Sequence, residues 1–348
     1  MSCGSAARRC FLQRAGLAAS FRYAPVCDIL SAASGASVIF TARLQPTSHC
    51  GLPPGARQEI DYGRREKGYA MNELITDGIV WFQFASLLDH ADMVTHGVFS
   101  RLGGVSEEPF SSLNAGPTTQ DDPSARLENY RRISTTLPGR PLLVGTKPLQ
   151  GSDVKEVTAA AIGLYAYPAA ILPDGCDAFI TRERGIGLFW AVADCSVILL
   201  VDVTHGAIGL THAGWRGTRD AIVAKTISAM GEAYGTRPAD LRVAIAPTIG
   251  PCCYEVDEAL RREFAANPFA DQNAHFSVVT VHDPAGGDRP SLRLDLQASN
   301  RSQLLACGVR EEHIEGSDYC PGSRTDLFFS HRMEGGRTGR FAVVLGLA

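Results

Sequence analysis

The chain has 348 residues, of which 45% are hydrophobic and 20% are charged, as in a globular protein with one large domain or two medium ones. No apolar run approaches the roughly 18 residues that a membrane-spanning helix needs, so we expect no membrane association. Residues 1–70 carry nine Lys or Arg and four Asp or Glu, a net +5, so the net charge of -4 leaves -9 on residues 71–348. This acidic body argues against nucleic acid as a partner.

The ten cysteines do not follow a disulfide framework or a C-x-x-C pattern, and Cys252 and Cys253 are adjacent. The N-terminus also lacks the basic, apolar and small-residue regions of a signal peptide. We therefore expect a reduced, cytoplasmic protein.

Residues 1–57 contain one acidic residue, Asp28, and no sustained helical or alternating pattern. An Arg-rich, acid-poor start suggests an organellar transit peptide or a start codon assigned too far upstream. We prefer the second interpretation because patterned apolar sequence begins directly after Met71. Residues 1–70 are thus expected to be an unstructured extension or a misassigned start, and residues 71–348 to form a single domain.

The pattern after Met71 alternates between strands and helices. In chain order, we expect a strand and long loop over 92–116, a helix over 123–137, and a strand, loop and strand over 141–157. Three apolar strands follow from Gly187, and then a helix that is capped by Thr218 and ends at Gly235. The rest is expected to be a strand opening into a turn over 241–256, a helix over 257–266, a helix ending near Cys307, and a closing hairpin around Gly335 and Gly336. The domain is therefore expected to be α/β, with mixed sheets and flanking helices.

Two reactive side chains stand at the ends of the expected hairpin formed by residues 196–203 and 206–211. Cys195 precedes the first strand and His212 follows the second, so pairing of the strands makes them neighbours. A thiol beside an imidazole can be a nucleophile with its base, or two ligands of a zinc ion. A buried thiol near a hydrogen-bonded imidazole, without chemistry, is the third interpretation.

Five segments carry a resemblance to a known family. They are, in order, "FSRLGGVSEEPFSSLNAG", "ADCSVILL", "THAGWRGT", "IGPCCYEV" and "FFSHR" followed by "GGRTGR". Over about residues 92–348 the chain resembles the YfiH/laccase-domain family of purine nucleoside-metabolising enzymes, formerly called multicopper polyphenol oxidoreductases.

The resemblance implies a four-layer α/β fold and a zinc site made of Cys195, His212 and one further histidine. It also implies phosphorolysis of adenosine, inosine and methylthioadenosine with phosphate as co-substrate, and deamination of adenosine. A laccase would need a cluster of copper ligands, which nine scattered histidines do not supply.

The chain departs from the family motif at the third ligand. In "PLQGSDV", Gln150 stands where the resemblance places the metal-binding histidine, and Pro148 where it places a glutamine. Gln150 would then be the third ligand, but an amide oxygen binds zinc poorly compared with imidazole. Further departures are Ser196-Val197 and Met333. The alternative is therefore a diverged, inactive member that binds nucleosides or another protein.

Three residues are candidates for substrate binding. Arg101 precedes a glycine turn and suits phosphate, although it can equally be a surface arginine. Asn114 can bind a ribose or close an Asx turn, and Arg216 can face the site beside Trp215. His331 is noted because the closing segment would line the pocket.

Overall fold

The computed structural model describes residues 71–163, 165–265, 275–283 and 287–348, which all lie within one compact unit, residues 39–348. Residues 1–70, for which the sequence predicts an extension or a misassigned start, lie outside the described residues. Within the described part, no helix is long and apolar enough to cross a membrane.

One sheet has seven strands. Its spatial order is β1 (Asn72–Thr76), β2 (Ile79–Gln83), β3 (Val94–Phe99), β15 (Phe341–Leu347), β8 (Ile186–Val192), β4 (Leu142–Pro148) and β6 (Ala169–Cys176). The C-terminal strand β15 lies in the middle and pairs antiparallel with both β3 and β8, whereas β4 is parallel to β6 and β8. The sheet is therefore mixed, as expected.

The second sheet has six strands. Its spatial order is β14 (Ile314–Gly316), β11 (Leu241–Ile245), β9 (Ser196–Asp202), β10 (Ala207–Ala213), β7 (Ala178–Thr181) and β5 (Val154–Glu156). Strands β9 and β10 form the hairpin predicted from the sequence, with His212 opposite Val197 and Ala213 opposite Ser196. Strand β7 pairs with the other edge of β10.

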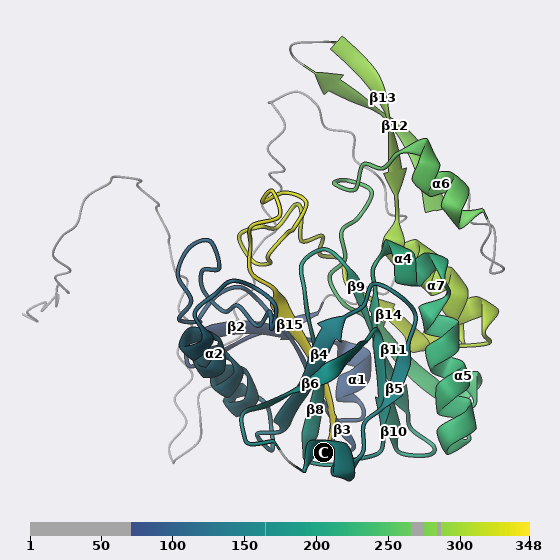
Figure 1. The fold of residues 1–348 in the computed structure, drawn as a ribbon. Helices are drawn as coiled ribbons and strands as arrows, with labels where there is room; N and C mark the ends of the chain where they lie inside the picture. The colour runs from purple at the N-terminus through teal and green to yellow at the C-terminus, as the bar shows by residue number, and fades with distance from the viewer. Residues whose placement is uncertain (1–70, 164, 266–274, 284–286) are drawn as a thin grey trace, which may run out of the picture. The chain divides into compact units, whose positions relative to one another are not determined.

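The two sheets pack face to face and helices cover their outer faces (Figure 1). Strand β9 is buried on both sides: Val197, Leu199 and Val201 join the cluster between the sheets, whereas Ile198 and Leu200 join the cluster beneath the helices. This alternation explains why the strand is apolar at nearly every position. The arrangement is the four-layer α/β fold that the resemblance implies.

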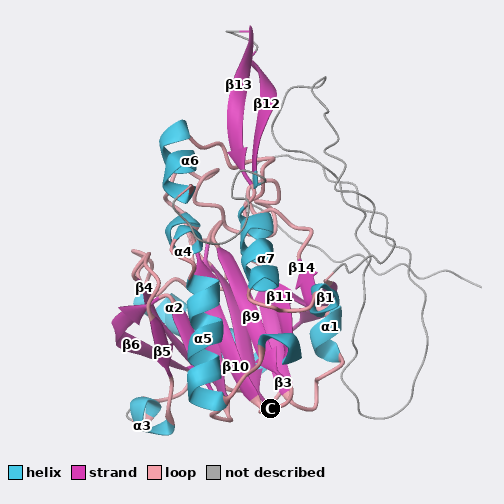
Figure 2. Ribbon diagram, turned by 90° about the vertical axis from the view of Figure 1, so that its right-hand side faces the viewer, coloured by secondary structure: helices cyan, strands magenta, loops and turns pink. Residues whose placement is uncertain are grey.

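The helices are short and most lie on the outer faces of the sheets. They are α1 (Ala85–Leu88), α2 (Pro123–Thr136), α3 (Ala159–Ile162), α4 (Trp215–Arg219), α5 (Ile222–Tyr234), α6 (Glu258–Phe264) and α7 (Leu296–Ala306), with 3-10 turns at Pro238–Asp240 and Glu311–His313. Helix α2 packs on the seven-stranded sheet, and α5 and α7 pack on the six-stranded sheet (Figures 1 and 2). Asp122 caps α2 by accepting hydrogen bonds from Ser124 N and Ala125 N.

Two sequence expectations are wrong in detail. Thr218 does not cap a long helix: it lies inside α4, and Ala221, with a φ of 59°, separates α4 from α5. The chain also does not close in a hairpin around Gly335 and Gly336. Instead, the Glu334 carboxylate accepts hydrogen bonds from Ser330 N and the Thr338 hydroxyl, which holds a compact turn before β15.

A separate two-stranded hairpin was not predicted. Strands β12 (Phe276–Asp283) and β13 (Gly287–Leu294) pair with each other and extend away from the two sheets (Figure 2). Its side chains are largely exposed toward the tip, whereas Leu292 and Leu294 at its base are buried.

Candidate functional site

The β9–β10 hairpin brings Cys195 and His212 together at one end of the six-stranded sheet. Cys195 directly precedes β9, and His212 is the penultimate residue of β10. The next residue after β10 is Gly214, which begins the turn into α4. Strand pairing fixes the register of the hairpin, so His212 is held within the sheet and Cys195 lies in the turn directly before it.

Three of the predicted site residues lie close to Gly214. A Cβ atom at Gly214 would lie 3.1 Å from Cys195 Sγ, 3.3 Å from Gln150 Oε1 and 3.7 Å from His212 Cε1. The thiol, the amide and the imidazole therefore border one small space. A larger residue at position 214 would fill it.

Asp177 orients this group, and the sequence reasoning did not identify it. It is fully buried between β6 and β7, and its Oδ1 lies 3.1 Å from His212 Nδ1. The same carboxylate accepts hydrogen bonds from the backbone N–H groups of Gln150 and Gly151 at 3.0 and 2.9 Å. Its backbone oxygen accepts from His212 N at 2.7 Å. One buried acid therefore positions both the imidazole and the loop that carries Gln150.

His212 is held in its charged form. Burial alone lowers its pKa, but hydrogen bonds from the imidazole to Asp177 and Cys195, with the charges of both, outweigh burial and raise the pKa to about 9. Since Nδ1 faces Asp177, Nε2 is the nitrogen left for Cys195 or for a metal ion.

The residues fit a catalytic zinc site only in part. A Cys sulfur and a His nitrogen are ligands that zinc prefers, and a carboxylate on the far ring nitrogen is the usual support of a zinc-bound histidine. The third neighbour is the Gln150 amide. Within the described residues, no further His, Cys, Asp or Glu joins Cys195 and His212 in a group of three suited to a metal ion. A catalytic zinc site uses three protein ligands, and only two of the three groups here bind zinc well.

Asp194 shapes the turn before Cys195. It has a φ of 87°, a region that non-glycine residues rarely occupy and that is often found at functional sites. Its carboxylate accepts hydrogen bonds from the Ser330 hydroxyl and from Arg332 N, both at 2.7 Å. Burial raises the pKa of Asp194. These bonds attach the segment after residue 320 to the Cys195 turn.

Arg101 is engaged with protein groups. Its NH1 donates to Glu334 Oε1 and to the Thr325 carbonyl, both at 2.9 Å, and its Nε donates to the Ser111 carbonyl. Its guanidinium also stacks over the Phe329 ring at 4.4 Å. Phosphate would therefore have to compete with Glu334, and the phosphate role of Arg101 stays a prediction.

Asn114 is fully buried, and its side chain is bonded at both ends. Its Oδ1 accepts from Gly116 N, the contact of an Asx turn, and from Arg340 N, while its amide donates to Thr119 and Asp121. In this structure the side chain organises the loop. Ribose binding by Asn114 would require these bonds to be exchanged.

Two arginines complete the polar surroundings. Arg216 is exposed and stacks over Trp215 at 4.1 Å. Arg340, which the sequence reasoning missed, is buried enough for desolvation to lower its pKa, although the charges of Cys195, Asp194 and Glu334 raise it. Its NH2 lies 3.4 Å from His331 Nδ1. The only signal for Arg340 in the sequence was its place in the motif "GGRTGR".

Comparison with known proteins gives one family. Residues 95–348 match the family model described as multi-copper polyphenol oxidoreductase laccase. "Purine nucleoside phosphorylase YlmD" of Geobacillus stearothermophilus is 36% identical over 252 residues, which cover 72% of this chain and 89% of that protein. "Adenosine deaminase RL5", from an unknown prokaryotic organism, is 34% identical over 169 residues, covering 48% of this chain and 60% of that protein.

The fold is shared with a solved structure. The crystal structure of hypothetical protein YfiH from Bacillus licheniformis is 28% identical and has a TM-score of 0.66. The match covers 78% of this chain and 97% of that chain.

Proposed function

Because the chain belongs to the family described as multi-copper polyphenol oxidoreductase laccase, with relatives named purine nucleoside phosphorylases, we propose that it acts on purine nucleosides and phosphate. The reaction is phosphorolysis of adenosine, inosine or methylthioadenosine, at the space bordered by Cys195, His212 and Gln150. The observation that carries the proposal is the Asp177–His212–Cys195 series of contacts at the end of β10.

The protonated His212 supplies a positive charge at this space. A cation there stabilises negative charge that develops when the purine leaves or when a substrate hydroxyl is polarised. Asp177 keeps the ring in one orientation, so the protein does not have to reorganise during the reaction. This role uses only side chains of the chain itself.

We place the phosphate-binding position beside Glu334. Arg101 donates to the Glu334 carboxylate at 2.9 Å, and Arg340 also experiences its charge. Because Arg101 already holds a carboxylate, phosphate would bind there by taking the place of Glu334 on the same guanidinium group. Substitution of either arginine should raise the KM for phosphate more than the KM for the nucleoside.

Zinc, if bound, would be held by Cys195 and His212 Nε2, with Gln150 as a weak third neighbour. It would supply a Lewis acid at the same position as the imidazolium charge. A catalytic zinc site takes its affinity from three ligands, and His212 must lose its proton to bind. We therefore propose that this chain holds zinc weakly at this site and turns over nucleosides slowly.

The test is a Gln150→His variant, which restores the imidazole that the family resemblance places here. Purine release from inosine, adenosine and methylthioadenosine with phosphate is measured, together with inosine formation from adenosine and zinc content. The variant should gain about one zinc ion per chain and release purine faster than the original protein. Gln150→His combined with His212→Ala is the control and should lose both gains.

Two outcomes contradict parts of the proposal. If the original protein already holds zinc that His212→Ala removes, and Gln150→His is no more active, the third ligand comes from another residue. If Gln150→His gains zinc but releases no purine and forms no inosine, the chain is a diverged binding protein of the same fold rather than an enzyme.

A further inference from the structure

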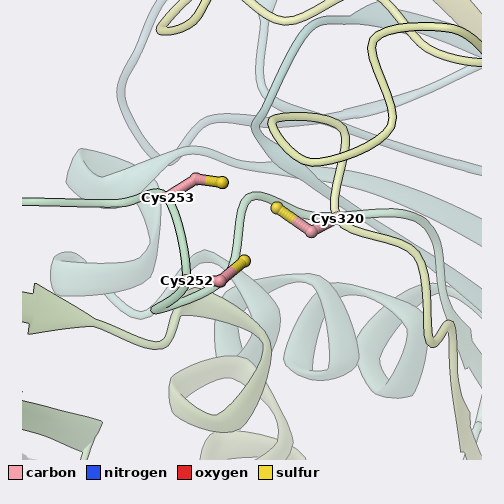
Figure 3. A group of neighbouring side chains, drawn as sticks. All are labelled: Cys252, Cys253 and Cys320. Atoms are coloured by element: carbon pink, nitrogen blue, oxygen red, sulfur yellow. The ribbon is translucent and has the colours of Figure 1, made fainter. Parts of the chain in front are cut away.

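Three cysteine side chains outside the Cys195–His212 site point toward a common space (Figure 3). Cys252 and Cys253 follow the Gly250-Pro251 turn, and Cys320 comes from the segment after β14. Their Sγ atoms all lie within 4.8 Å of one another. We call these three residues the thiol cluster.

The backbone holds the thiol cluster in place from both sides. Cys253 N and Tyr254 N both donate to the Gly250 carbonyl, at 3.0 and 2.9 Å. On the other side, Ser323 N and Arg324 N donate to the Cys320 carbonyl, at 3.1 and 3.0 Å. Each segment is therefore a closed turn, and the three sulfurs are positioned before any ligand binds.

Gly322 allows the two turns to approach closely. A Cβ atom at Gly322 would lie 2.8 Å from Cys253 Cβ and 3.1 Å from its Sγ. Such contacts exclude any side chain at this position without movement of the Cys253 turn. The local sequence thus permits Cys253 to lie against the Cys320 segment.

Cys320 also has a backbone hydrogen-bond donor. Its sulfur accepts a hydrogen bond from Gly250 N at 3.3 Å. Cys252 is exposed, so solvent and ions reach the thiol cluster from that side.

The spacing suits a metal ion coordinated by sulfur. Zinc–sulfur bonds of about 2.3 Å in a tetrahedral site place the sulfurs roughly 3.8 Å apart. This separation is within the 4.8 Å that bounds the distances between the three sulfurs. All three residues carry reduced thiols in the structure. Among the described residues, this is the one set of three or more His, Cys, Asp or Glu side chains close enough to share a metal ion.

We propose that Cys252, Cys253 and Cys320 form a binding site for a thiophilic d10 metal ion of the zinc class, separate from the Cys195–His212 site. Binding replaces sulfur–hydrogen bonds with sulfur–metal bonds and releases the thiol protons to solvent, with no change of oxidation state. Three cysteine ligands leave a fourth tetrahedral position for water, and Cys252 is exposed to solvent.

The bound ion would connect two segments that support the candidate active site. Ile249 N donates to the Asp194 carbonyl at 2.9 Å, just before the Cys252 turn. After Cys320, the chain continues to Ser330 and Arg332, which hold the Asp194 carboxylate. A metal ion at the thiol cluster therefore fixes both sides of the turn that presents Cys195.

The experiment is a titration of the reduced, metal-free full chain with Cd2+, read as sulfur-to-cadmium charge-transfer absorbance. The original protein should give a band whose intensity corresponds to at least three thiolates, and Zn2+ should displace it. Cys320→Ser and Cys252→Ser should each lose most of the band and bind Cd2+ at least about tenfold more weakly. Cys252→Ser changes an exposed side chain, and circular dichroism checks that both variants fold.

Two cysteine variants separate this site from other thiols. Cys195→Ser removes the sulfur of the proposed nucleoside site and should leave the strong band in place, so failure of the proposed function does not affect this result. Cys307→Ser removes a half-buried thiol at the end of α7 and should also have no effect. A band lost in Cys195→Ser but kept in Cys320→Ser, or a cadmium band that Zn2+ does not displace, overturns the proposal.

Discussion

Asp177 supports the candidate site through its contacts with His212 and the Gln150 loop. Its carboxylate binds the His212 ring and two backbone N–H groups of the Gln150 loop. Hydrogen bonds to a charged group of this kind contribute more than neutral ones, about 1.5–3 kcal/mol each. The imidazolium, the loop position and part of the local stability thus depend on one acid.

This dependence gives a stability profile with a defined sign. The pKa of His212 is about 9 in the folded protein and 6.5 without the fold. The folded state therefore binds the proton more tightly, and the resulting stability is complete below pH 6.5 and is lost as pH rises through about 9. In metal-free protein, urea unfolding should show a loss of up to about 3 kcal/mol across that window.

Asp177→Asn should remove this alkaline loss. Without the carboxylate, burial dominates and the pKa of His212 falls, which an NMR titration of the ring measures directly. Asp174→Asn is the matched control, because Asp174 is an exposed acid paired with Lys155 and should leave the profile unchanged. An unchanged His212 titration in Asp177→Asn would show that another group sets its pKa.

At the scale of elements, the junction from β10 to α4 decides how much room the site has. Gly214 has a φ of -67°, which any residue can adopt, so its importance is spatial rather than conformational. The break at Ala221 lets α4 end within five residues, after which α5 packs along the sheet with Val223, Ile227 and Met230 buried. A single long helix from Thr218 would not have made this turn.

Gly214→Ala should therefore impair the site and leave the fold intact. The added methyl group would lie 3.1 Å from Cys195 Sγ and 3.3 Å from Gln150 Oε1, so these side chains must move by a few tenths of an ångström. In the Gln150→His protein, we expect purine release to fall about tenfold, since small displacements of reacting groups are costly. The melting temperature should change by only a few degrees.

Gly231→Ala is the control for that substitution. Gly231 lies inside α5, and an added Cβ would come no closer than 3.4 Å to the Thr236 carbonyl. Alanine should stabilise the helix by up to about 1 kcal/mol without affecting purine release. Equal losses of activity in both variants would indicate a general effect of glycine replacement rather than crowding at Gly214.

At the scale of the molecule, the described part of the core lies between the four layers. Apolar residues of β8, β9, β10 and β15 form the cluster between the two sheets, and Trp190 stacks on Phe179 there with ring centroids 5.1 Å apart. Strand β1 begins at Asn72 and is paired along its length with β2. The described strands thus include one that begins directly after Met71.

A protein that begins at Met71 should consequently be about as stable as the full chain. The sequence of residues 1–57 lacks the periodic apolar positions that a core requires, so its removal should shift the melting temperature by no more than about 2 °C. Calorimetry of both proteins is the measurement. A large decrease on deletion would mean that part of residues 1–70 contributes to the domain.

The sequence by itself determined the features that depend on local pairing. Apolar runs on either side of the turn near Gly206 predicted the β9–β10 hairpin, and antiparallel register then required Cys195 and His212 to be neighbours. The histidine expected at position 150 came from the family resemblance alone, and its replacement by Gln150 as the loss of a metal ligand stays a prediction. The closing segment was misread as a hairpin because its strand β15 pairs with distant β3 and β8.

Only the tertiary structure identified Asp177 and the thiol cluster. Asp177 meets His212 because β7 lies beside β10, a sheet order that sequence spacing does not specify. Cys320 meets Cys252 and Cys253 because two turns from separate parts of the chain pack against each other at Gly322. The physical reason is the same in both cases: periodicity records which face of an element is buried, whereas contacts between polar groups far apart in sequence are set by how the layers assemble.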